Sequence, residues 1–460
     1  MGGQNEISNM RITVSNKIFL QDVPTDFAGG IKTRLTLKNP AWIEAVKMGR
    51  WTGNLDEYLH CYEISENGLI LPRGLCRKLV TLCRDRSIPC QFMDNRRTLP
   101  DVSFTFDGKL KAFQRTAVDA VLERDFGVLS SPTGSGKTIM ALAIVAARKQ
   151  PTLIVVHTRE LLNQWIDRIG AFLGIPATEI GIIGGGKTRI GDKLTVALVQ
   201  SLYKCASDVA PYVGHLIVDE CHRTPSRTFS EAVSAFDSRY MLGLSATPYR
   251  RDGLDRLINW ALGDVSHTVD SASLVENGHI LKAEVVTRET EFETYLDASE
   301  QYSQVLSELT RDHARNLLIC RDVATEALNG GGICLVLSDR KSHCQVISEI
   351  LRDHYNVKAE LLTGDLPKSA REDVVDRLNQ GQVKVLIATS QLLSEGFDCK
   401  ELSTLFMITP ISFEGRLVQC MGRILRPGPG KRARVYDYSD VNVGVLAASG
   451  RARQKVYAAA

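Results

Sequence analysis

The sequence predicts an α/β protein in which two consecutive parallel-sheet domains follow a small α+β module. Between residues 126 and 247, short apolar runs rich in β-branched residues are bounded by polar residues, which is typical of buried parallel strands; they are FGVLSS, TLIVVH, LTVALVQ, HLIVDE and YMLGLSAT. Stretches between these runs, such as RELLNQWIDRIGAFL, place apolar residues at helical spacing. Because strands and helices alternate, this segment predicts a doubly wound parallel sheet.

The same alternation restarts after residue 284. A helical pattern runs from Ala298 to Leu328, and strand-like runs follow at GICLVLS, AELLTG, VKVLIATS and TLFMIT. The chain of 460 residues is long enough for two or three domains that each bury a core. We therefore expect the two large domains at 99–280 and 281–446, followed by a tail at 447–460.

The first 98 residues have a different pattern. The runs NKIFL, TRLTL and YLHCYEI indicate strands, and LPRGLCRKLVTLCRDR indicates a basic helix after a proline-containing turn. We expect a separate α+β module at 1–98, joined to the first large domain by the linker RTLPDVSFTFDGKL.

The global charge says little about partners, but two local basic clusters are evident. Lys and Arg total 56 against 53 Asp and Glu, which gives a formal net charge of +3. Between Pro72 and Arg97 the chain has seven basic residues and two acidic ones, and a second basic cluster at 416–434 has no acidic residue. Either cluster could be a solvated face, and for the first cluster taken alone this explains it as well as a nucleic-acid contact does.

Eleven cysteines without a CxxC pair argue against a disulfide framework and against a zinc ribbon. Cys76, Cys83 and Cys90 recur every seven residues near His60 and Cys61, but buried thiols of a reduced protein explain them better than a metal site. No apolar run approaches the ~18 residues that span a bilayer, and the polar start MGGQNEISNM lacks a signal-peptide core. We expect a soluble, cytoplasmic protein with no membrane partner.

The stretch SSPTGSGKT predicts a phosphate-binding loop, because it follows the strand FGVLSS and opens the helix KTIMALAIVAARK. Its glycines let the backbone close around phosphate oxygens, while backbone N–H groups face the anion. Lys137 would reach the β- and γ-phosphates and the Thr138 hydroxyl would hold Mg²⁺. Ser131 stands where the simplest pattern has Gly, and the strand–loop–helix context disfavours a turn that binds nothing. The predicted loop contacts are Thr133, Gly134, Ser135, Gly136, Lys137 and Thr138.

The stretch HLIVDECH predicts the second half of the same site. A strand delivers Asp219 at its carboxyl end, where the carboxylate suits a Mg²⁺ partner. The adjacent Glu220 could also touch the metal, and it is placed to orient and deprotonate an attacking water. Two carboxylates at a strand end could instead cap a loop, but the upstream phosphate loop favours the catalytic interpretation.

These motifs together are recognisable. SPTGSGKT, DECH, SATP (Ser245–Pro248) and QCMGRILR (Gln419–Arg426) resemble, in this order, the motifs of superfamily 2 helicases over Lys109–Arg426. The resemblance implies two tandem RecA-like domains and ATP hydrolysis that needs Mg²⁺ and nucleic acid. In that superfamily the first position of the phosphate loop is often Ala or Ser, which accounts for Ser131.

The resemblance also assigns further nucleotide contacts. LKAFQ is similar to the adenine-reading segment, which implicates Gln114 and Phe113, although the family usually has Arg-Pro where this chain has Lys111-Ala112. In the second domain SEGFD adds Gly396 and Asp398 to the expected nucleotide contacts.

QCMGRILR should supply positive charge to the γ-phosphate. Arg423 and Arg426 are three residues apart, so we expect them to share one face of a helix and to act, one or both, as arginine fingers. Gln419 would lie near the attacking water. The residues expected to couple ATP to nucleic acid are His222, Ser245 and Thr247.

Several short motifs resemble the superfamily's contacts to the nucleic-acid backbone. Their hydroxyl side chains, glutamine and open backbone N–H groups satisfy phosphates without reading bases. In the first domain the expected contacts are Thr158, Arg159, Gly185, Gly186, Gln200 and Ser201. In the second they are Ser338, Arg340, Thr363, Gly364 and Thr389.

LGLSATPYRRDGLDRL and LVENGHILKAEVV look like the XPB and UvsW-type branch of DNA helicases and translocases. The N-terminal NGLILPRGLCRKL is similar to the extra module of small phage helicases, which also fits a phage gene product in a bacterial host. On this reading Arg73, Arg77 and Arg84 bind duplex or junction DNA through phosphate contacts.

The sequence thus predicts an ATP-dependent DNA helicase or translocase that acts on duplex, branched or single-stranded DNA in repair, recombination or replication. Three alternatives stay open: an RNA helicase, the motor subunit of a defence or restriction assembly, and an inert nucleic-acid-binding scaffold. The intact set of catalytic residue types disfavours the scaffold.

Overall fold

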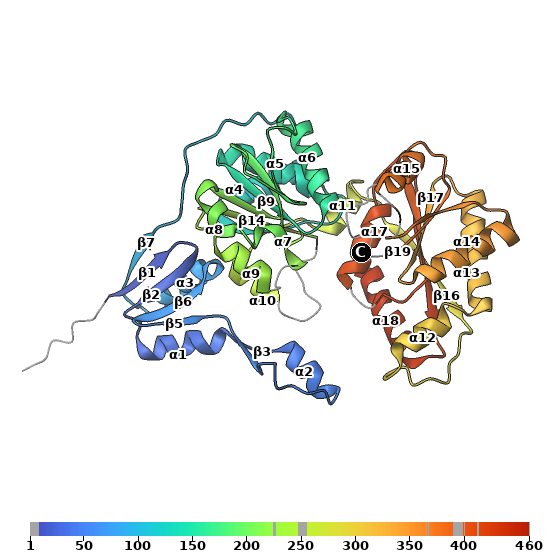
Figure 1. Cartoon of the computed structure of the whole chain (residues 1–460), viewed down its shortest axis with the longest axis horizontal. Coiled ribbons are helices and arrows are strands. Elements are labelled where there is room, and N and C mark those ends of the chain that lie inside the picture. The colour runs from blue at the N-terminus through green and yellow to red at the C-terminus, as the bar shows by residue number, and fades with distance from the viewer. Residues whose placement is uncertain are drawn as a thin grey trace, which may run out of the picture. The chain divides into compact units, whose positions relative to one another are not determined.

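The computed structural model describes residues 9–223, 227–246, 255–364, 366, 368–389, 399, 401–411 and 414–459 (Figure 1). The chain divides into two compact units, residues 1–131 with 137–269 and residues 132–136 with 270–460. The first unit contains the N-terminal module and the first large domain, and the second contains the other large domain. No described helix combines the length and the hydropathy needed to cross a membrane.

The N-terminal module is a mixed sheet with strand order β5-β6-β2-β1-β7, packed against helices α1 and α3. Met10, Ile12 and Val14 alternate into a core that is completed by Leu79 and Cys83 of α3. The elements are β1 (Met10–Val14), β2 (Lys17–Gln21), α1 (Thr25–Arg34), β3 (Thr36–Lys38), α2 (Pro40–Lys47), β4 (Tyr58–His60), β5 (Glu63–Ser65), β6 (Gly68–Pro72), the 3₁₀ turn η1 (Arg73–Leu75), α3 (Cys76–Asp85) and β7 (Cys90–Asp94).

The cysteines of this module act as core residues. Cys76 and Cys83 lie on the buried face of α3, whereas Cys90 is exposed on β7. Burial raises the pKa of the Cys83 thiol to about 11, so it stays protonated. Within the described ranges no three His, Cys, Asp or Glu side chains are grouped so as to hold a metal ion.

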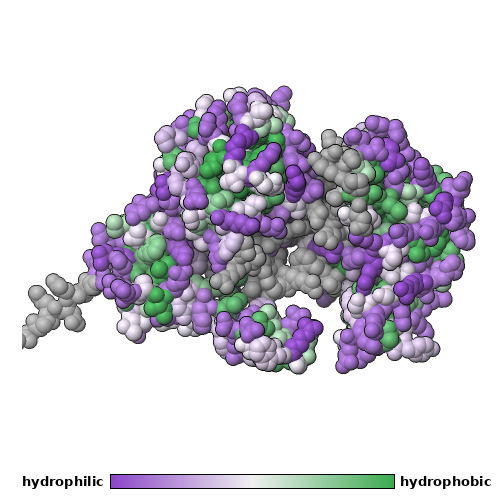
Figure 2. Space-filling view, viewed as in Figure 1, coloured by the Kyte–Doolittle hydropathy of each residue, from purple (hydrophilic) through white to green (hydrophobic). Residues whose placement is uncertain are grey.

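An excursion that carries β3, α2 and β4 leaves the N-terminal sheet. It exposes apolar side chains, among them Trp51 at 76% and Met48 at 54% exposure. The space-filling view shows hydrophobic residues at the surface of this excursion (Figure 2).

The first large domain is an eight-stranded sheet with order β11-β10-β12-β9-β13-β14-β8-β15, parallel except for the β10–β11 hairpin. Helix α5 packs against both α4 and α6, and α9 packs against both α7 and α10. The strands are β8 (Phe126–Ser130), β9 (Thr152–Val156), β10 (Gly181–Gly184), β11 (Lys187–Arg189), β12 (Leu194–Leu198), β13 (His215–Val218), β14 (Tyr240–Ser245) and β15 (Val265–Thr268). The helices are α4 (Ala112–Leu122), α5 (Lys137–Arg148), α6 (Arg159–Leu173), α7 (Val199–Leu202), α8 (Ala206–Val209), α9 (Arg227–Ser234) and α10 (Asp255–Leu262), with 3₁₀ turns η2 (Ala210–Tyr212) and η3 (Cys221–Arg223).

A buried arginine docks the N-terminal module on this domain. Arg73, only 3% exposed, donates hydrogen bonds from Nη1 to the carbonyl oxygens of Ser15 (3.3 Å), Phe236 (3.3 Å) and Ser238 (2.8 Å). Burial lowers the pKa of its guanidinium to about 9, which still leaves it charged at neutral pH. The prediction that Arg73 contacts DNA is therefore wrong, because its guanidinium is buried and donates to carbonyl groups inside the protein.

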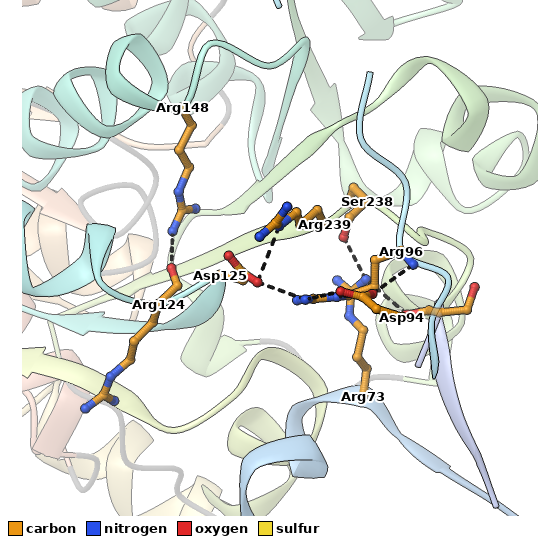
Figure 3. A network of polar contacts seen from close by, with 9 residues as sticks. Arg73, Asp94, Arg96, Arg124, Asp125, Arg148, Ser238 and Arg239 are labelled. Carbon is orange, nitrogen blue, oxygen red and sulfur yellow. Dashed lines mark hydrogen bonds and ion pairs between the residues drawn. The ribbon is translucent and has the colours of Figure 1, made fainter. Parts of the chain in front are cut away.

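Two other arginines of the same basic run also join the N-terminal module to the first large domain, and Figure 3 shows one of them, Arg96. Arg96 bridges Asp94 of its own module and Asp125 of the large domain, with Nη2–Oδ2 distances of 2.7 and 2.8 Å. Arg97 pairs with Asp237 through Nε and Oδ1 at 2.9 Å. Much of the basic cluster thus holds two modules together rather than forming a free cationic surface.

Replacing Arg73 by Ala should destabilise the first unit by about 1–3 kcal/mol per buried acceptor left without a donor. Urea unfolding followed by circular dichroism measures this loss. Arg77→Ala, at an exposed position on α3, is the control and should leave the midpoint unchanged. Equal stability of the two variants would contradict a docking role for Arg73.

The second large domain is a six-stranded parallel sheet with order β16-β21-β20-β17-β19-β18. Helices α13 and α14 pack together, as do α17 and α18. The strands are β16 (Ala283–Thr290), β17 (Ile333–Ser338), β18 (Ala359–Leu362), β19 (Val385–Thr389), β20 (Leu402–Met407) and β21 (Ala433–Asp440). The helices are α11 (Ser271–Glu276), α12 (Tyr302–Leu309), α13 (His313–Asn329), α14 (Lys341–Tyr355), α15 (Lys368–Asn379), α17 (Glu414–Ile424) and α18 (Gly444–Ala459).

Two expectations about this domain need correction. The helical pattern over 298–328 is two helices, because Asp312 interrupts it and caps α13 by accepting a hydrogen bond from Arg315 N at 2.7 Å. The expected tail is the larger part of α18, and Arg453 in it is 4% exposed and donates from Nε to Asp437 Oδ1 at 2.8 Å. Leu446 in the first turn of α18 packs in a hydrophobic cluster, whereas a buried ion pair anchors the part of the helix beyond residue 446, where the sequence has no regular apolar stripe. The boundaries at 98 and 280 stay predictions.

Candidate functional site

The predicted phosphate loop lies between β8 and α5. Gly134 and Gly136 have φ values of 87° and 89°. This left-handed conformation is strained for residues that have a Cβ atom, but glycine adopts it freely. Ser131 is fully buried, and its N–H donates to Ser245 O at 2.9 Å. Lys137 Nζ donates to Ser131 O at 3.0 Å. The loop is therefore a turn of fixed shape, with its lysine held at the rim by the loop's own carbonyl.

Asp219 and Glu220 follow β13, as the sequence predicts. Trp165 Nε1 donates to Asp219 Oδ2 at 2.8 Å, and Glu220 N donates to Asp219 Oδ1 at 3.0 Å. Burial raises the pKa of Asp219, and the neighbouring Glu220 carboxylate raises it further. Glu220 has φ 50°, a conformation uncommon outside glycine, which turns the chain sharply at this point. Two carboxylates are thus held close together where a cation would relieve their repulsion.

His222 and Ser245 connect this turn to the phosphate loop. His222 Nδ1 lies 3.0 Å from Ser245 Oγ and 3.3 Å from Glu220 Oε2. Since Ser245 O also accepts the Ser131 N–H, polar contacts run continuously from Glu220 through His222 and Ser245 to the phosphate loop. Thr247, the third predicted coupling residue, lies outside the described residues.

Strand order explains this assembly. β13, β14 and β8 are neighbours in the sheet, and parallel strands end at one edge, so their following residues meet there.

Gln114, 6% exposed, lies at the start of α4, where its Oε1 accepts a hydrogen bond from Lys111 N at 2.9 Å. Phe113 beside it is half-buried.

The residues expected to contact nucleic acid follow the other half of the same sheet, β9, β12 and β10. Thr158 caps α6, with Oγ1 accepting from Leu161 N at 3.3 Å. The neighbouring Arg159 places its guanidinium 3.3 Å from the position a Cβ would take at Gly185. Gln200 and Ser201 lie in α7 directly after β12, and Gly186 follows Gly185 in the turn to β11.

In the second domain the corresponding residues follow β17, β19 and β18, which are neighbours in its sheet. The prediction that Ser338 contacts the nucleic acid is wrong. Its side chain is fully buried, with Oγ 3.0 Å from His343 Nδ1, so it is not placed to touch a phosphate. Arg340 donates from Nη2 to Ser303 Oγ at 3.0 Å. Thr363 and Gly364 follow β18, and Thr389 ends β19.

The structure describes Gln419, Arg423 and Arg426 but not all of the other predicted nucleotide contacts of this domain. Arg423 is half-buried on α17, and Gln419 on the same helix is 8% exposed. The expectation that Arg423 and Arg426 share one helix face is wrong, because α17 ends at Ile424 and Arg426 lies in the following bend. Gly396 and Asp398 lie outside the described residues.

Known proteins match the chain at both large domains. Residues 107–250 match the family model of the Type III restriction enzyme, res subunit, and residues 318–428 match the Helicase conserved C-terminal domain. The chain is 30% identical over 350 residues to the DNA 3'-5' translocase XPB2 of Sulfurisphaera tokodaii, covering 69% of this chain and 79% of that protein. It is 28% identical over 309 residues to Probable helicase D10 of Escherichia phage T5, covering 67% of this chain and 66% of that protein. Against several other relatives the match covers 51–63% of the relative's own length.

The fold has a solved counterpart in the fragment of a putative HsdR subunit of a type I restriction enzyme from Vibrio vulnificus YJ016. The TM-score is 0.58 at 15% identity, covering 95% of this chain and 81% of that one. Two parallel-sheet domains with helicase motifs at their strand ends define an ATP-hydrolysing motor of the helicase type. The chain belongs to the superfamily 2 helicases, within their XPB-like branch.

Proposed function

We propose that this protein is an ATP-driven motor that moves along or unwinds DNA, acting on duplex or branched substrates in repair, recombination or replication. The observation that carries the proposal is the chain of polar contacts that links Glu220, His222 and Ser245 to the phosphate loop. A nucleotide that changes the conformation of the phosphate loop would therefore act, through these contacts, on the turn that carries Asp219 and Glu220. Support for DNA comes from the DNA translocase among its relatives, and a phage relative supports action inside a bacterial cell.

The described residues fit an ATP–Mg²⁺ complex. Positive φ values at Gly134 and Gly136 open the backbone toward an anion, and Lys137 is within reach of it once it leaves Ser131 O. Thr138 and Asp219 provide the oxygen ligands that Mg²⁺ prefers, with Glu220 beside them. Bound Mg²⁺ would neutralise charge on the phosphates during transfer.

We assign the remaining roles as follows. Glu220 orients the attacking water and accepts its proton, while Gln419, Arg423 and Arg426 act on the γ-phosphate side. Gln114 and Phe113 contact the adenine, and Gly396 and Asp398 complete the nucleotide contacts.

Phosphates of the nucleic acid should contact hydroxyl groups, amides and N–H groups rather than base edges. In the N-terminal module Arg77 and Arg84 remain candidates, because both are exposed on α3. The proposed contacts of the large domains are Thr158, Arg159, Gly185, Gly186, Gln200, Ser201, Arg340, Thr363, Gly364 and Thr389.

Two other functions have specific support. One relative is a putative ATP-dependent RNA helicase of Acanthamoeba polyphaga mimivirus, 28% identical over 345 residues, which keeps RNA as a candidate polymer. The match to a restriction-enzyme family model keeps a restriction motor as a second candidate.

ATPase rates separate these possibilities. The rate should be measured without nucleic acid and with single-stranded DNA, duplex DNA, branched DNA and RNA of equal length. We expect stimulation by DNA, with duplex or branched DNA at least as effective as single strands. Stimulation by RNA alone would contradict the proposed substrate.

Trp165 is a positioning residue that sequence reasoning missed. It lies two turns into α6, whose first residues are proposed nucleic-acid contacts, and its indole N–H holds Asp219. Only tertiary structure pairs them, since 54 residues separate them along the chain.

Replacing Trp165 by Phe should therefore raise the Mg²⁺ concentration for half-maximal ATPase by about 10–100-fold, as expected for loss of a group that orients a metal ligand. Trp260→Phe, at another buried tryptophan, is the matched control. An unchanged Mg²⁺ requirement in a folded Trp165→Phe protein would exclude this positioning role.

A further inference from the structure

An apolar cavity of about 280 Å³ lies between the N-terminal module and the first large domain. Ile31 and Leu35 of α1, Leu79 and Leu82 of α3, and Trp260 of α10 line it. Trp260 also belongs to the hydrophobic core of the N-terminal module, so that core continues across the contact between the two modules. The cavity is thus a gap in a shared core, open to solvent on one side.

The rim of this cavity is cationic. Arg34 and Arg256 are exposed, and among the residues that the structure describes neither has a carboxylate partner. Lys78, the third cation, pairs with Asp264 of the large domain. A second hollow of about 320 Å³ shares Arg34, Lys78 and Leu82 with the first, so the apolar cavity adjoins a polar trough. Arg77, Asp85 and Asp264 also line this trough, so that cations outnumber carboxylates around the two hollows together.

The combination selects a ligand with two kinds of group. A bulky apolar side chain that enters the cavity is removed from contact with water. This transfer contributes about 1.5–3 kcal/mol to the free energy of binding for a residue of the size of Leu or Phe. Carboxylates beside it would pair with the guanidinium groups of Arg34 and Arg256, and bidentate pairing favours carboxylates in this setting.

Nucleic acid fits this surface less well. Phosphate groups would pair with the cations, but they would gain nothing from contact with the apolar side chains that form the floor of the cavity. Unpaired bases bind by stacking on exposed aromatic faces, whereas this floor is mainly aliphatic and its one aromatic residue, Trp260, is 6% exposed.

We infer that this cavity and its cationic rim form a docking site for an acidic peptide segment of a partner protein that carries one or two bulky apolar residues. The occupant would contact α1 and α3 of the N-terminal module together with α10 of the motor domain. It would therefore favour the docked state of the module and recruit the motor to the protein that bears the segment. The inference is independent of which nucleic acid the motor uses.

The test uses the full chain and a fluorescein-labelled synthetic peptide, Glu-Asp-Glu-Leu-Phe-Asp-Glu-Asp, in fluorescence anisotropy titrations. We expect saturable binding that weakens at least about tenfold, or 1.4 kcal/mol, when Leu-Phe is replaced by Ala-Ala. Arg34→Glu at the rim and Leu82→Arg in the cavity should weaken it by a similar factor. Arg50→Glu, an exposed arginine of the α2 excursion, is the charge-matched control and should bind normally.

Folding and function are followed separately, so a failed variant cannot mimic the result. Each variant should keep the parental melting temperature and nucleic-acid-stimulated ATPase rate. No saturation below about 1 mM peptide, or equal binding by the Arg34→Glu protein, would overturn the inference. It would also be overturned if a single-stranded oligonucleotide displaced the peptide and the Arg34→Glu change weakened that oligonucleotide, because the trough would then belong to a nucleic-acid surface.

Discussion

A Glu220→Gln protein should hydrolyse ATP about 10²–10⁴-fold more slowly than the parent while still binding the nucleotide. The amide keeps the size of the side chain and can still contact His222, whose Nδ1 lies 3.3 Å from Glu220 Oε2. It cannot accept a proton from the attacking water, so the chemical step loses its base. Steady-state ATPase assays with saturating DNA measure turnover, and a fluorescent ATP analogue measures binding.

The comparison variants for this experiment are Glu179→Gln and Lys137→Ala. Glu179 is exposed on the same domain, so Glu179→Gln should be fully active. Lys137→Ala should also abolish turnover, because the loop loses the cation aimed at the phosphates. If the Glu220→Gln and Lys137→Ala proteins both kept hydrolysis, the nucleotide site would be assigned to the wrong residues.

Loss of an arginine finger is the second large effect that we expect. Arg423→Ala, Arg426→Ala or both should lower the DNA-stimulated ATPase rate by about 10³–10⁵-fold, since a finger neutralises charge that develops in the transition state. Because α17 ends at Ile424, the two arginines have different settings, and unequal effects are expected. The rate should fall with little change in the affinity for DNA.

Arg432→Ala is the matched control for this experiment. Arg432 belongs to the same basic cluster but is exposed beyond the helix, so its loss should change the rate less than twofold in rough terms. Wild-type rates in both the Arg423→Ala and Arg426→Ala proteins would rule out an arginine finger in this segment.

Sequence reasoning succeeded where local pattern and structure have the same cause. Buried parallel strands must be apolar along their whole length, so runs such as TLIVV and HLIV marked β9 and β13 directly. Turns that approach an anion require glycine, so Gly134 and Gly136 were recognisable before their φ values were known. The family motifs then ordered these elements into a superfamily 2 motor.

It failed where a side chain has a partner far away in the chain. Arg73 looks like a surface cation, yet it binds carbonyl groups of Phe236 and Ser238, more than 160 residues away. Ser338 looks like a phosphate contact, but its hydroxyl is buried against His343.

By itself, the sequence determined the two parallel-sheet domains, the phosphate loop and the acidic pair that follows β13, because spacing along one strand or loop suffices to specify them. Only the tertiary structure decided which polar groups are buried and what they bind: Trp165 on Asp219, Arg73 between two modules, and the cationic rim around an apolar cavity. The physical reason is that burial and pairing depend on neighbours brought together by folding, which no local window of the chain contains.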